Sequence, residues 1–164
     1  MMMKKIIYIE EEFLSKEECK NFIEYYLAHK SSIEYYSNYQ SSTFILNIFP
    51  TYKKNKIFSE TVDRVSQRCK SFDSNISLQD LQIVKWPRAS FMKPHLDHIP
   101  DDIFAAMIYL NDDFTGGYTC FEHLKVKPEV GKMIIFSNTQ YRHYVSEVNS
   151  GMRYTFAFWF IRSK

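Results

Sequence analysis

The sequence is poor in glycine, proline and cysteine, with 4 Gly, 5 Pro and 3 Cys among 164 residues. So little glycine and proline excludes a collagen-like, repetitive or flexible low-complexity chain. Cys19, Cys69 and Cys120 are odd in number and widely separated. We therefore expect neither a disulfide framework nor a Cys-x-x-Cys zinc site, and we interpret all three as reduced thiols that pack in the interior.

Long apolar runs and a large excess of one charge are also missing. No run reaches membrane-spanning length, and residues 1–9 are too short for a signal peptide before the acidic residues 10–12. We therefore expect a cytoplasmic protein with no membrane partner. The 21 Lys and Arg residues nearly balance 19 Asp and Glu. This lacks the basic footprint of a dedicated nucleic-acid binder, so no nucleic-acid partner is indicated.

Aromatic residues are abundant, at 17% of the chain, with 14 Phe and 12 Tyr. A chain of this length and composition can bury a proper core without disulfides or a structural metal. We expect a single domain over residues 1–164, with helical support at about 13–72 and a barrel core at about 78–162.

Two amphipathic helices are expected in the first half of the chain. Ser15 and Glu18 form a capping box at the start of the first helix. Residues 55–72 have apolar positions at helical intervals and predict the second helix. The apolar positions are Cys19, Phe22, Ile23 and Tyr26 in the first helix, and Ile57, Val62, Val65 and Cys69 in the second. The Ser- and Tyr-rich segment 31–42 is typical of a surface loop.

Strands dominate the second half. Segments rich in β-branched and aromatic residues predict strands at 5–9, 43–49, 81–86, 89–92, 105–110, 118–121, 133–136, 144–148 and 152–161. Turn signals at 112–117, 128–132 and 149–151 separate several of them. Helices followed by a run of strands indicate an α+β fold whose sheet curls into a sandwich or barrel.

The last predicted strand has two different faces. One face carries Tyr154, Phe156, Phe158 and Phe160, and the other carries Arg153, Thr155, Ala157 and Trp159. The aromatic face suits a core. The other face, with a cation, a hydroxyl and a small residue, suits the wall of a cavity that holds an anion. By the same alternation, Tyr109 can enter this cavity.

A candidate metal site begins at His95 and Asp97. Side chains two positions apart on a strand project from one face, so these two supply two ligands of a two-histidine, one-carboxylate iron site. A solvated loop is the alternative for this short motif. His143 precedes a predicted strand, and a hairpin through residues 149–151 would bring it beside Arg153. The planar guanidinium of arginine suits a carboxylate ligand.

Taken together, these features resemble the 2-oxoglutarate- and Fe(II)-dependent oxygenases, in particular the prolyl 4-hydroxylase-like group, from about residue 81 to 160. The match consists of His-x-Asp at 95–97, Tyr-Leu-Asn at 109–111, Gly-Gly at 116–117, His143 and Arg153. The resemblance implies a distorted double-stranded β-helix, a jelly-roll or cupin-like barrel buttressed by the N-terminal helices.

The resemblance also implies roles for individual residues. His95, Asp97 and His143 would be the iron ligands, Arg153 would bind the distal carboxylate of 2-oxoglutarate, and Tyr109 would be its hydrogen-bonding companion.

Other positions are less closely matched. Trp159 resembles a family position beside the metal, and Thr155 is expected on the same cosubstrate wall. Trp86 stands where many relatives have a tyrosine, a departure that leaves its contact with 2-oxoglutarate open. Arg142 is a candidate substrate contact or a solvent-exposed arginine. His98 is interpreted as a bystander on a loop.

The implied activity is hydroxylation of a C–H bond, with Fe(II), 2-oxoglutarate as cosubstrate, O2 and ascorbate as a possible reductant. A prolyl 4-hydroxylase-like enzyme acting on a proline-containing peptide is the first expectation. A hydroxylase of a free amino acid or other small molecule, and a non-catalytic module that binds metal and a 2-oxo acid, are the alternatives. A carboxylate at Asp97 favours hydroxylation over halogenation. Specificity is expected on the loops 31–42, 99–104 and 122–127.

Overall fold

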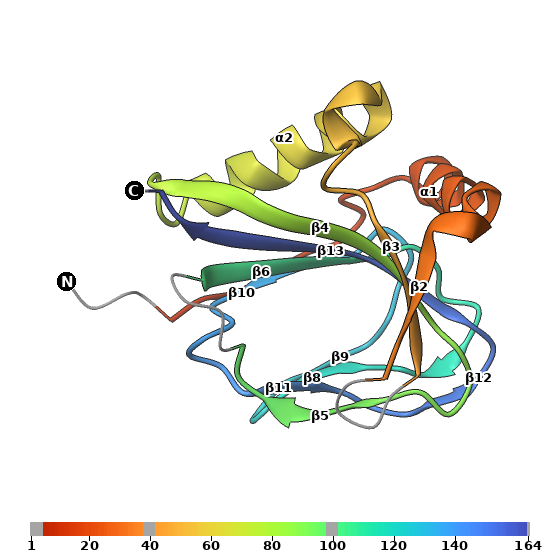
Figure 1. Cartoon of the computed structure of the whole chain (residues 1–164). Helices are drawn as coiled ribbons and strands as arrows, with labels where there is room; N and C mark the ends of the chain where they lie inside the picture. The colour runs from red at the N-terminus through yellow and green to blue at the C-terminus, as the bar shows by residue number, and fades with distance from the viewer. Residues whose placement is uncertain (1–4, 38–41, 98–101, 164) are drawn as a thin grey trace.

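In the computed structural model, residues 5–37, 42–97 and 102–163 are described. Two β-sheets face each other, and two helices cover the outer face of the larger sheet (Figure 1). This confirms the α+β fold and the barrel with helical support. Among the described residues, no helix has the length and apolar character needed to cross a membrane.

The large sheet has seven strands and the small sheet has four. The large sheet contains β1 (Ile7–Glu10), β2 (Ile33–Tyr36), β3 (Thr43–Asn47), β4 (Ile76–Trp86), β6 (Asp102–Tyr109), β10 (Met133–Phe136) and β13 (Arg153–Arg162). The small sheet contains β5 (Met92–His95), β8 (Thr119–Phe121), β9 (Lys125–Val126) and β11 (His143–Val145). A third pair is formed by β7 (Thr115–Gly116) and β12 (Val148–Ser150).

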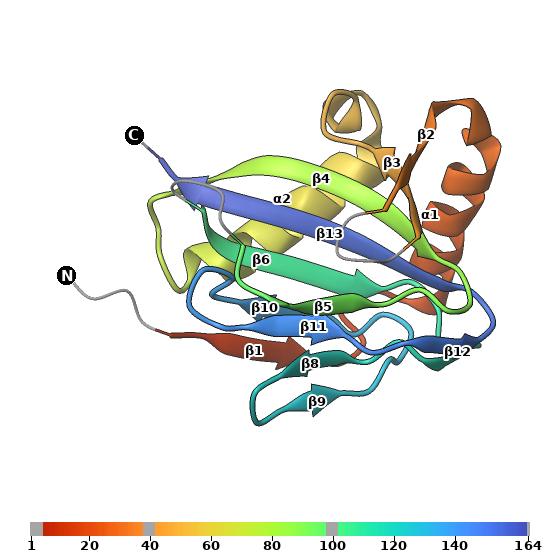
Figure 2. The ribbon, with the colours of Figure 1, turned by 60° about the horizontal axis from the view of Figure 1, so that its bottom comes forward.

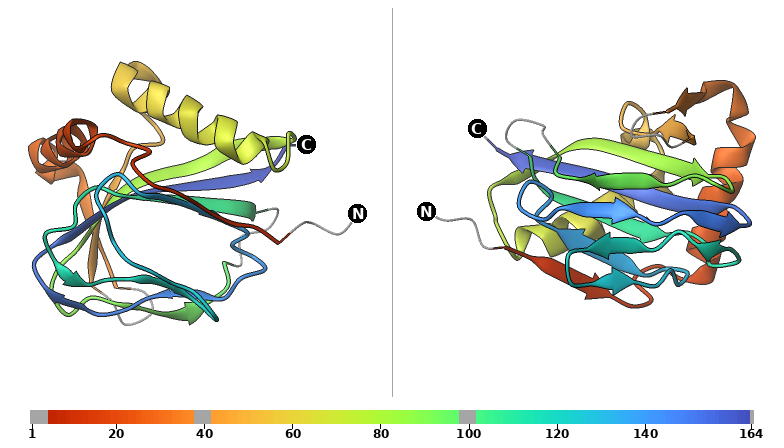
Figure 3. Two further views of the ribbon diagram at one scale, coloured as in Figure 1. Left: turned by 180° about the vertical axis from the view of Figure 1, so that it is seen from behind. Right: turned by 90° about the horizontal axis from the view of Figure 1, so that it is seen from below.

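The strand order is β1-β10-β6-β13-β4-β3-β2 in the large sheet and β5-β11-β8-β9 in the small sheet. The small sheet lies in front of the large one in Figure 2. The views in Figure 3 show both helices on the face of the large sheet that points away from the small sheet. The helices are α1 (Lys16–Ala28) and α2 (Lys56–Lys70), and the short 3-10 helices are η1 (Lys30–Ser32) and η3 (Tyr52–Lys54). All pairings in the two main sheets are antiparallel.

Both helices begin directly after a residue whose side chain caps the helix N-terminus. Ser15 Oγ accepts from the backbone N–H of Glu18, and the Glu18 carboxylate accepts from the backbone N–H of Ser15. Asn55 caps α2 in the same way by accepting from the N–H of Ile57. The expectation that Ile57 faces the core is wrong: its side chain is 45% exposed. Phe58 takes the inward position of this first turn.

The core lies between the helices and the aromatic face of β13, as the alternation of β13 predicts. Phe156 packs against Phe22 of α1 and Phe58 of α2, with ring centroids 4.9 and 5.7 Å apart. Phe158 and Phe160 are buried beside it. Each such ring stabilises the fold by about 1.5–3 kcal/mol through burial. The opposite face of β13 is therefore left to face the small sheet.

The prediction of a surface loop over residues 31–42 is wrong for its first half. Residues 33–36 form β2, which pairs with β3 through partners such as Tyr35 and Phe44. Cross-strand aromatic pairing stabilises this edge strand in spite of its polar composition. Tyr39 and the rest of 38–41 lie outside the described residues.

Three other boundaries differ from the expectations. The strand predicted at 89–92 begins only at Met92, because Pro87 starts a turn closed by the N–H of Ser90. The loop predicted at 122–127 contains β9, which pairs with β8. The loop predicted at 99–104 ends early because β6 begins at Asp102. Residues 98–101 are outside the described part of the chain.

The predicted hairpin between residues 144–148 and 152–161 does not form. β11 begins at His143 and ends at Val145, and the chain then enters β12, which pairs with β7. From there it crosses into the large sheet, where β13 lies between β4 and β6. His143 and Arg153 are therefore on opposite sheets and meet across the space between them.

Candidate active site

A cavity of about 490 Å³ lies between the two sheets. The small sheet and the segment after β5 contribute His95, Asp97, Thr119 and His143 to its lining, and the large sheet contributes Arg153, Thr155, Ala157 and Trp159. The prediction that the polar face of β13 forms a cavity wall is thus correct.

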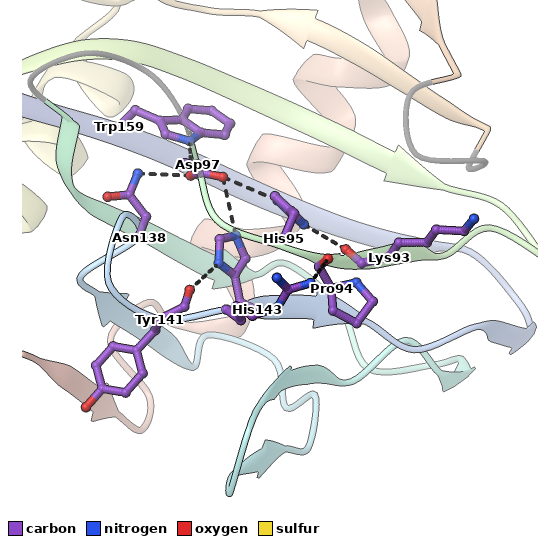
Figure 4. Close-up of polar contacts among 9 residues, drawn as sticks. Lys93, Pro94, His95, Asp97, Asn138, Tyr141, His143 and Trp159 are labelled. Carbon is purple, nitrogen blue, oxygen red and sulfur yellow. Dashed lines mark hydrogen bonds and ion pairs between the residues drawn. The ribbon is translucent and has the colours of Figure 1, made fainter.

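Three potential metal ligands converge in this cavity (Figure 4). Asp97 Oδ1 lies 3.3 Å from His95 Nε2 and 3.5 Å from His143 Nε2. The ligand atoms of all three residues lie within 4.8 Å of one another. His95 and His143 are directly opposite each other on β5 and β11. The expectation that Asp97 shares a strand with His95 is wrong, because β5 ends at His95, but both side chains still point to one place.

Hydrogen bonds at Nδ1, on the side of each ring away from Asp97, fix the orientation of both imidazoles. His95 Nδ1 lies 2.8 Å from the carbonyl oxygen of Lys93, and His143 Nδ1 lies 3.0 Å from that of Tyr141. A carbonyl only accepts, so each Nδ1 carries the hydrogen. Each Nε2 then faces Asp97 Oδ1: with a proton it donates to this oxygen, and without one it offers the lone pair that a metal ligand needs.

The second oxygen of Asp97 is also held. Asn138 Nδ2 donates to Asp97 Oδ2 at 2.9 Å, and Trp159 Nε1 donates to the same oxygen at 3.3 Å (Figure 4). The backbone N–H of Asp97 donates to the Asn138 carbonyl. The two oxygens of Asp97 therefore have separate tasks: Oδ2 is anchored and Oδ1 faces the histidines.

The electrostatics of the three groups follow from these contacts. Burial alone would raise the pKa of Asp97, but hydrogen bonds from His143, His95 and Asn138 outweigh it, so this pKa lies well below its usual range. Burial opposes the charged form of His95, yet its bonds to Asp97 and to the Lys93 carbonyl raise its pKa overall. The carboxylate is thus ionised near neutral pH, and an incoming metal ion competes with a proton at His95.

Arg153 lies deep in the cavity with its charge uncompensated. It is only 2% exposed, and none of the described carboxylates forms an ion pair with it. Nη2 donates to Thr119 Oγ1 at 3.4 Å, and the guanidinium stacks on Trp86, 4.8 Å from the ring centroid. Nε is buried and has no hydrogen-bond partner. Burial lowers the pKa of this guanidinium. A buried cation with an unused donor fits a carboxylate ligand.

Gly117 makes room for this arginine. Its φ of +63° is in the left-handed region, and a Cβ at this position would lie 2.8 Å from Cδ of Arg153. The Gly-Gly motif therefore leaves room for the buried side chain of Arg153 in addition to making a turn.

The remaining residues expected around the cosubstrate differ in position. Thr155 and Trp86 line the cavity, and the Trp86 indole N–H donates to Thr155 Oγ1 at 3.2 Å. The indole donor is therefore already used. Tyr109 lies behind the cavity wall, fully buried, with its hydroxyl 2.7 Å from Thr119 Oγ1 and its ring centroid 5.4 Å from the Arg153 guanidinium. It supports Arg153 and Thr119 from behind.

Arg142 does not reach the cavity. Its side chain is exposed and donates to the Pro94 carbonyl, so it links β11 to β5 on the outside. His98 lies outside the described residues. His29 stacks on Tyr25, and His123 is exposed beside Glu122, both away from the site.

Sequence reasoning did not find Asn138 and Thr119. Both are polar and almost fully buried, and both contact a candidate ligand-binding residue. Asn138 follows a four-residue apolar strand, a position at which a buried amide needs a partner. Thr119 gives no signal of its own in the sequence.

The donor set suits Fe(II). Two imidazole nitrogens and one carboxylate oxygen are the ligands of the facial triad that binds non-heme iron and leaves coordination positions open. His95, Asp97 and His143 could hold this ion, and the lone donor of Arg153 in the same cavity fits a dicarboxylate such as 2-oxoglutarate.

Comparison with known sequences agrees with this site. Residues 81–161 match the family model of the 2OG-Fe(II) oxygenase superfamily. Prolyl 3-hydroxylase 2 of Rattus norvegicus and of Homo sapiens are each 37% identical to the chain over 65 residues, which are 35% of this chain. The chain spans only 9% of the length of these relatives.

Solved structures share the fold. A viral collagen prolyl hydroxylase from Paramecium bursaria Chlorella virus-1, in complex with 2OG, has a TM-score of 0.76 at 18% identity, and the match covers 96% of each chain. A Pseudomonas putida prolyl-4-hydroxylase has a TM-score of 0.77 at 16% identity, covering 96% of this chain and 93% of the other. A prolyl hydroxylase from Trichoplax adhaerens, in complex with a hypoxia inducible factor peptide, has a TM-score of 0.78 at 17% identity, covering 95% and 83%. Residues 81–161 are therefore similar in sequence to the 2OG-Fe(II) oxygenase superfamily, and the chain shares the fold of these prolyl hydroxylases.

Proposed function

We propose that the protein is a 2-oxoglutarate- and Fe(II)-dependent dioxygenase that hydroxylates a proline in a peptide or protein. One observation carries the proposal. His95, Asp97 and His143 converge in the same cavity as the unpaired, buried Arg153. The relatives named as prolyl hydroxylases support proline as the target.

In this proposal each side chain has one task. His95, Asp97 and His143 hold the metal through Nε2, Oδ1 and Nε2, and the bonds behind the two imidazoles keep them in the ligand tautomer. Arg153 binds the distal carboxylate of 2-oxoglutarate, with Thr155 beside it and Tyr109 supporting it from behind.

When bound, Fe(II) with 2-oxoglutarate and O2 supplies the oxidising chemistry: one oxygen atom enters the C–H bond, and the other leaves in succinate as CO2 is released. The chain itself orients the cosubstrate, and the buried walls around Arg153 and Thr155 exclude water from that end of the cavity.

The test is to incubate Fe(II)-loaded protein with 2-oxoglutarate, O2 and a proline-rich peptide. Succinate and a peptide heavier by one oxygen atom should form in equal amounts, and His143→Ala should form neither. Free proline is the comparison for a small-molecule substrate. Succinate formation that responds to no peptide would contradict the peptide assignment.

A second test needs no turnover. Anaerobic addition of Fe(II) and 2-oxoglutarate should produce a weak metal-to-ligand charge-transfer band, which His143→Ala abolishes. Arg153→Ala should weaken 2-oxoglutarate binding and leave metal binding unchanged. The site assignment is wrong if both variants behave as wild type.

We also propose that the protein works in a reducing compartment such as the cytoplasm. All three cysteines are buried and unpaired, as expected where thiols remain reduced. Cell fractionation with an antibody to the protein tests this; recovery from an oxidising compartment would contradict it.

A further inference from the structure

Four polar side chains on the concave face of the large sheet have no part in the site described above. Glu34 of β2, Asn47 of β3, and Asp80 and Gln82 of β4 line the same cavity as the metal ligands. We call these four residues the polar strip. Asp80 is paired across the strands with Trp159, the residue that contacts Asp97, so the strip begins beside the metal site. It ends at β2, the edge of the large sheet.

The strip is negatively charged. Gln82 Nε2 donates to Asp80 Oδ2 at 2.7 Å, and the N–H of Leu81 donates to Asp80 Oδ1, which fixes this carboxylate without neutralising it. Within the described part of the chain, no lysine, arginine or histidine forms an ion pair with Glu34 or Asp80.

The charge of the rest of the cavity does not offset the strip. Arg153 is the one cationic side chain among the described lysines and arginines that line the cavity. Although the two residues form no ion pair, the formal charges of Arg153 and Asp97 add up to zero. Fe(II) and doubly ionised 2-oxoglutarate would balance each other. The negative charges of Glu34 and Asp80 are therefore not balanced within the cavity. A substrate with a positive charge would pair with them, which lowers the free energy of the complex.

The length of the strip favours a polypeptide. Glu34 on β2 lies three strand spacings from β13, or about 14 Å across the sheet. Through Ile45 and Val84 it is in register with Thr155, four residues or about 13 Å along β13 from Trp159. The path from Trp159 to Glu34 is therefore about 19 Å along the concave face. An extended chain covers this path with about six residues. A free amino acid at the metal would be too short to contact Glu34.

From these observations, which rest on the proposed function, we infer that the polar strip selects a peptide substrate with a basic side chain within a few residues of the proline. Glu34 and Asp80 are the specificity-determining residues. Asp80 acts close to the metal and Glu34 acts toward the open edge of the sheet.

The experiment uses three acetylated, amidated ten-residue peptides with one central proline, whose flanking residues are lysine, glutamine or glutamate. Hydroxylation is measured by mass spectrometry and binding by fluorescence anisotropy with the anaerobic Fe(II) and 2-oxoglutarate complex. The lysine peptide should bind best and the glutamate peptide worst. Because partly exposed charge pairs are weak, Glu34→Gln and Asp80→Asn should each reduce this preference by about twofold to fivefold.

Glu60→Gln is the matched control, because Glu60 is an exposed acid on α2, on the other side of the large sheet. It should leave the preference unchanged, whereas Glu34→Lys should shift it toward the glutamate peptide. Equal binding of the three peptides to wild type, or an unchanged preference in both Glu34→Gln and Asp80→Asn, would overturn the inference.

The hydroxylation and binding measurements together distinguish a failure of the inference from a failure of the proposed function. Hydroxylation of all three peptides at one rate with equal affinity overturns the charge preference and leaves the function standing. Charge-selective binding without hydroxylation of any peptide supports the strip and contradicts the function. Competition by N-acetyl-lysine amide as strong as that of the lysine peptide overturns the assignment of a polypeptide.

Discussion

At the scale of single residues, Arg153, the proposed cosubstrate-binding group, is in a position that weakens the fold. Its guanidinium is removed from water, finds one long hydrogen bond to Thr119 and is left with a bare Nε. An uncompensated buried charge costs a protein several kcal/mol. The contact with Trp86 offsets only part of this cost, since a cation–π interaction contributes about 0.5–2 kcal/mol. A bound carboxylate would supply the missing partner.

The substitution Arg153→Met should therefore stabilise the ligand-free protein. We expect an increase of about 1 kcal/mol in the free energy of unfolding, or about 2–4 °C in Tm, because the buried charge is gone while most of the volume remains. The same variant should lose the rise in Tm that 2-oxoglutarate gives the wild type. Differential scanning fluorimetry with and without the cosubstrate measures both, and Arg153→Lys keeps the charge as a control. A Tm several degrees lower in Arg153→Met would show that the guanidinium stabilises the fold.

Asn138 should act on the metal through Asp97. Removing its amide in Asn138→Ala takes one of the two side-chain donors from Asp97 Oδ2 and leaves that of Trp159. The Asp97 N–H still donates to the backbone carbonyl of residue 138. Loss of such an outer partner weakens metal binding by about 10- to 100-fold. Competition titration with a chelator measures the affinity, and Thr139→Ala serves as the neighbouring control. Wild-type affinity in Asn138→Ala would mean that Trp159 alone positions the carboxylate.

At the scale of elements, the sequence contained most of the fold because local signals agreed with the final packing. The capping box at Ser15 fixed the start of α1, and the alternation in β13 separated the core face from the cavity face. The sequence-based predictions were wrong where pairing between distant segments determines the structure. β2 exists because β3 lies beside it, and His143 is separated from the β13 sheet because β12 pairs with β7.

The same distinction applies to the site. His95, Asp97, His143 and Arg153 belong to a motif that can be read from spacing and residue type. Asn138 and the polar strip cannot be found in that way, since Asp80 meets Trp159 only through the register of β4 and β13. Their roles follow from which strand lies next to which.

The N-terminal cap of α1 allows a prediction about the contribution of one helix end to the free energy of unfolding. Ser15→Ala removes the acceptor for the N–H of Glu18 and should lower the free energy of unfolding by about 1 kcal/mol. Lys16→Ala, an exposed change one residue further, should have little effect. Urea denaturation followed by circular dichroism compares the two, and equal stability of both variants would show that the capping box contributes nothing.

At the scale of the whole molecule, the candidate metal site joins segments from different sheets. β5 is at the edge of the small sheet and pairs there with β11, with His95 and His143 as directly opposed partners. Asp97 is tied to Asn138, which follows β10 of the large sheet. A metal ion bound to all three ligands would therefore link both sheets.

Metal should consequently stabilise the protein as a whole. At a free Fe(II) or Mn(II) concentration 100 times Kd, ligand binding to the native state adds about 2.7 kcal/mol to the free energy of unfolding. Tm and the rate of limited proteolysis should both report the change. His143→Ala should be insensitive to the added metal; an equal rise in its Tm would place the stabilising ion elsewhere.

The opposed pair His95 and His143 gives the ion a second importance that lies outside catalysis. When the ion leaves, the edge strand β5 loses one of its links, and its ladder with β11, the outer bond from Arg142 to Pro94 and the packing of Met92 against the cluster that contains Trp86 remain. The strand that carries the first ligand is then held less firmly at the edge of its sheet. The supply of iron would thus govern how long each copy of the protein survives as well as how fast it works.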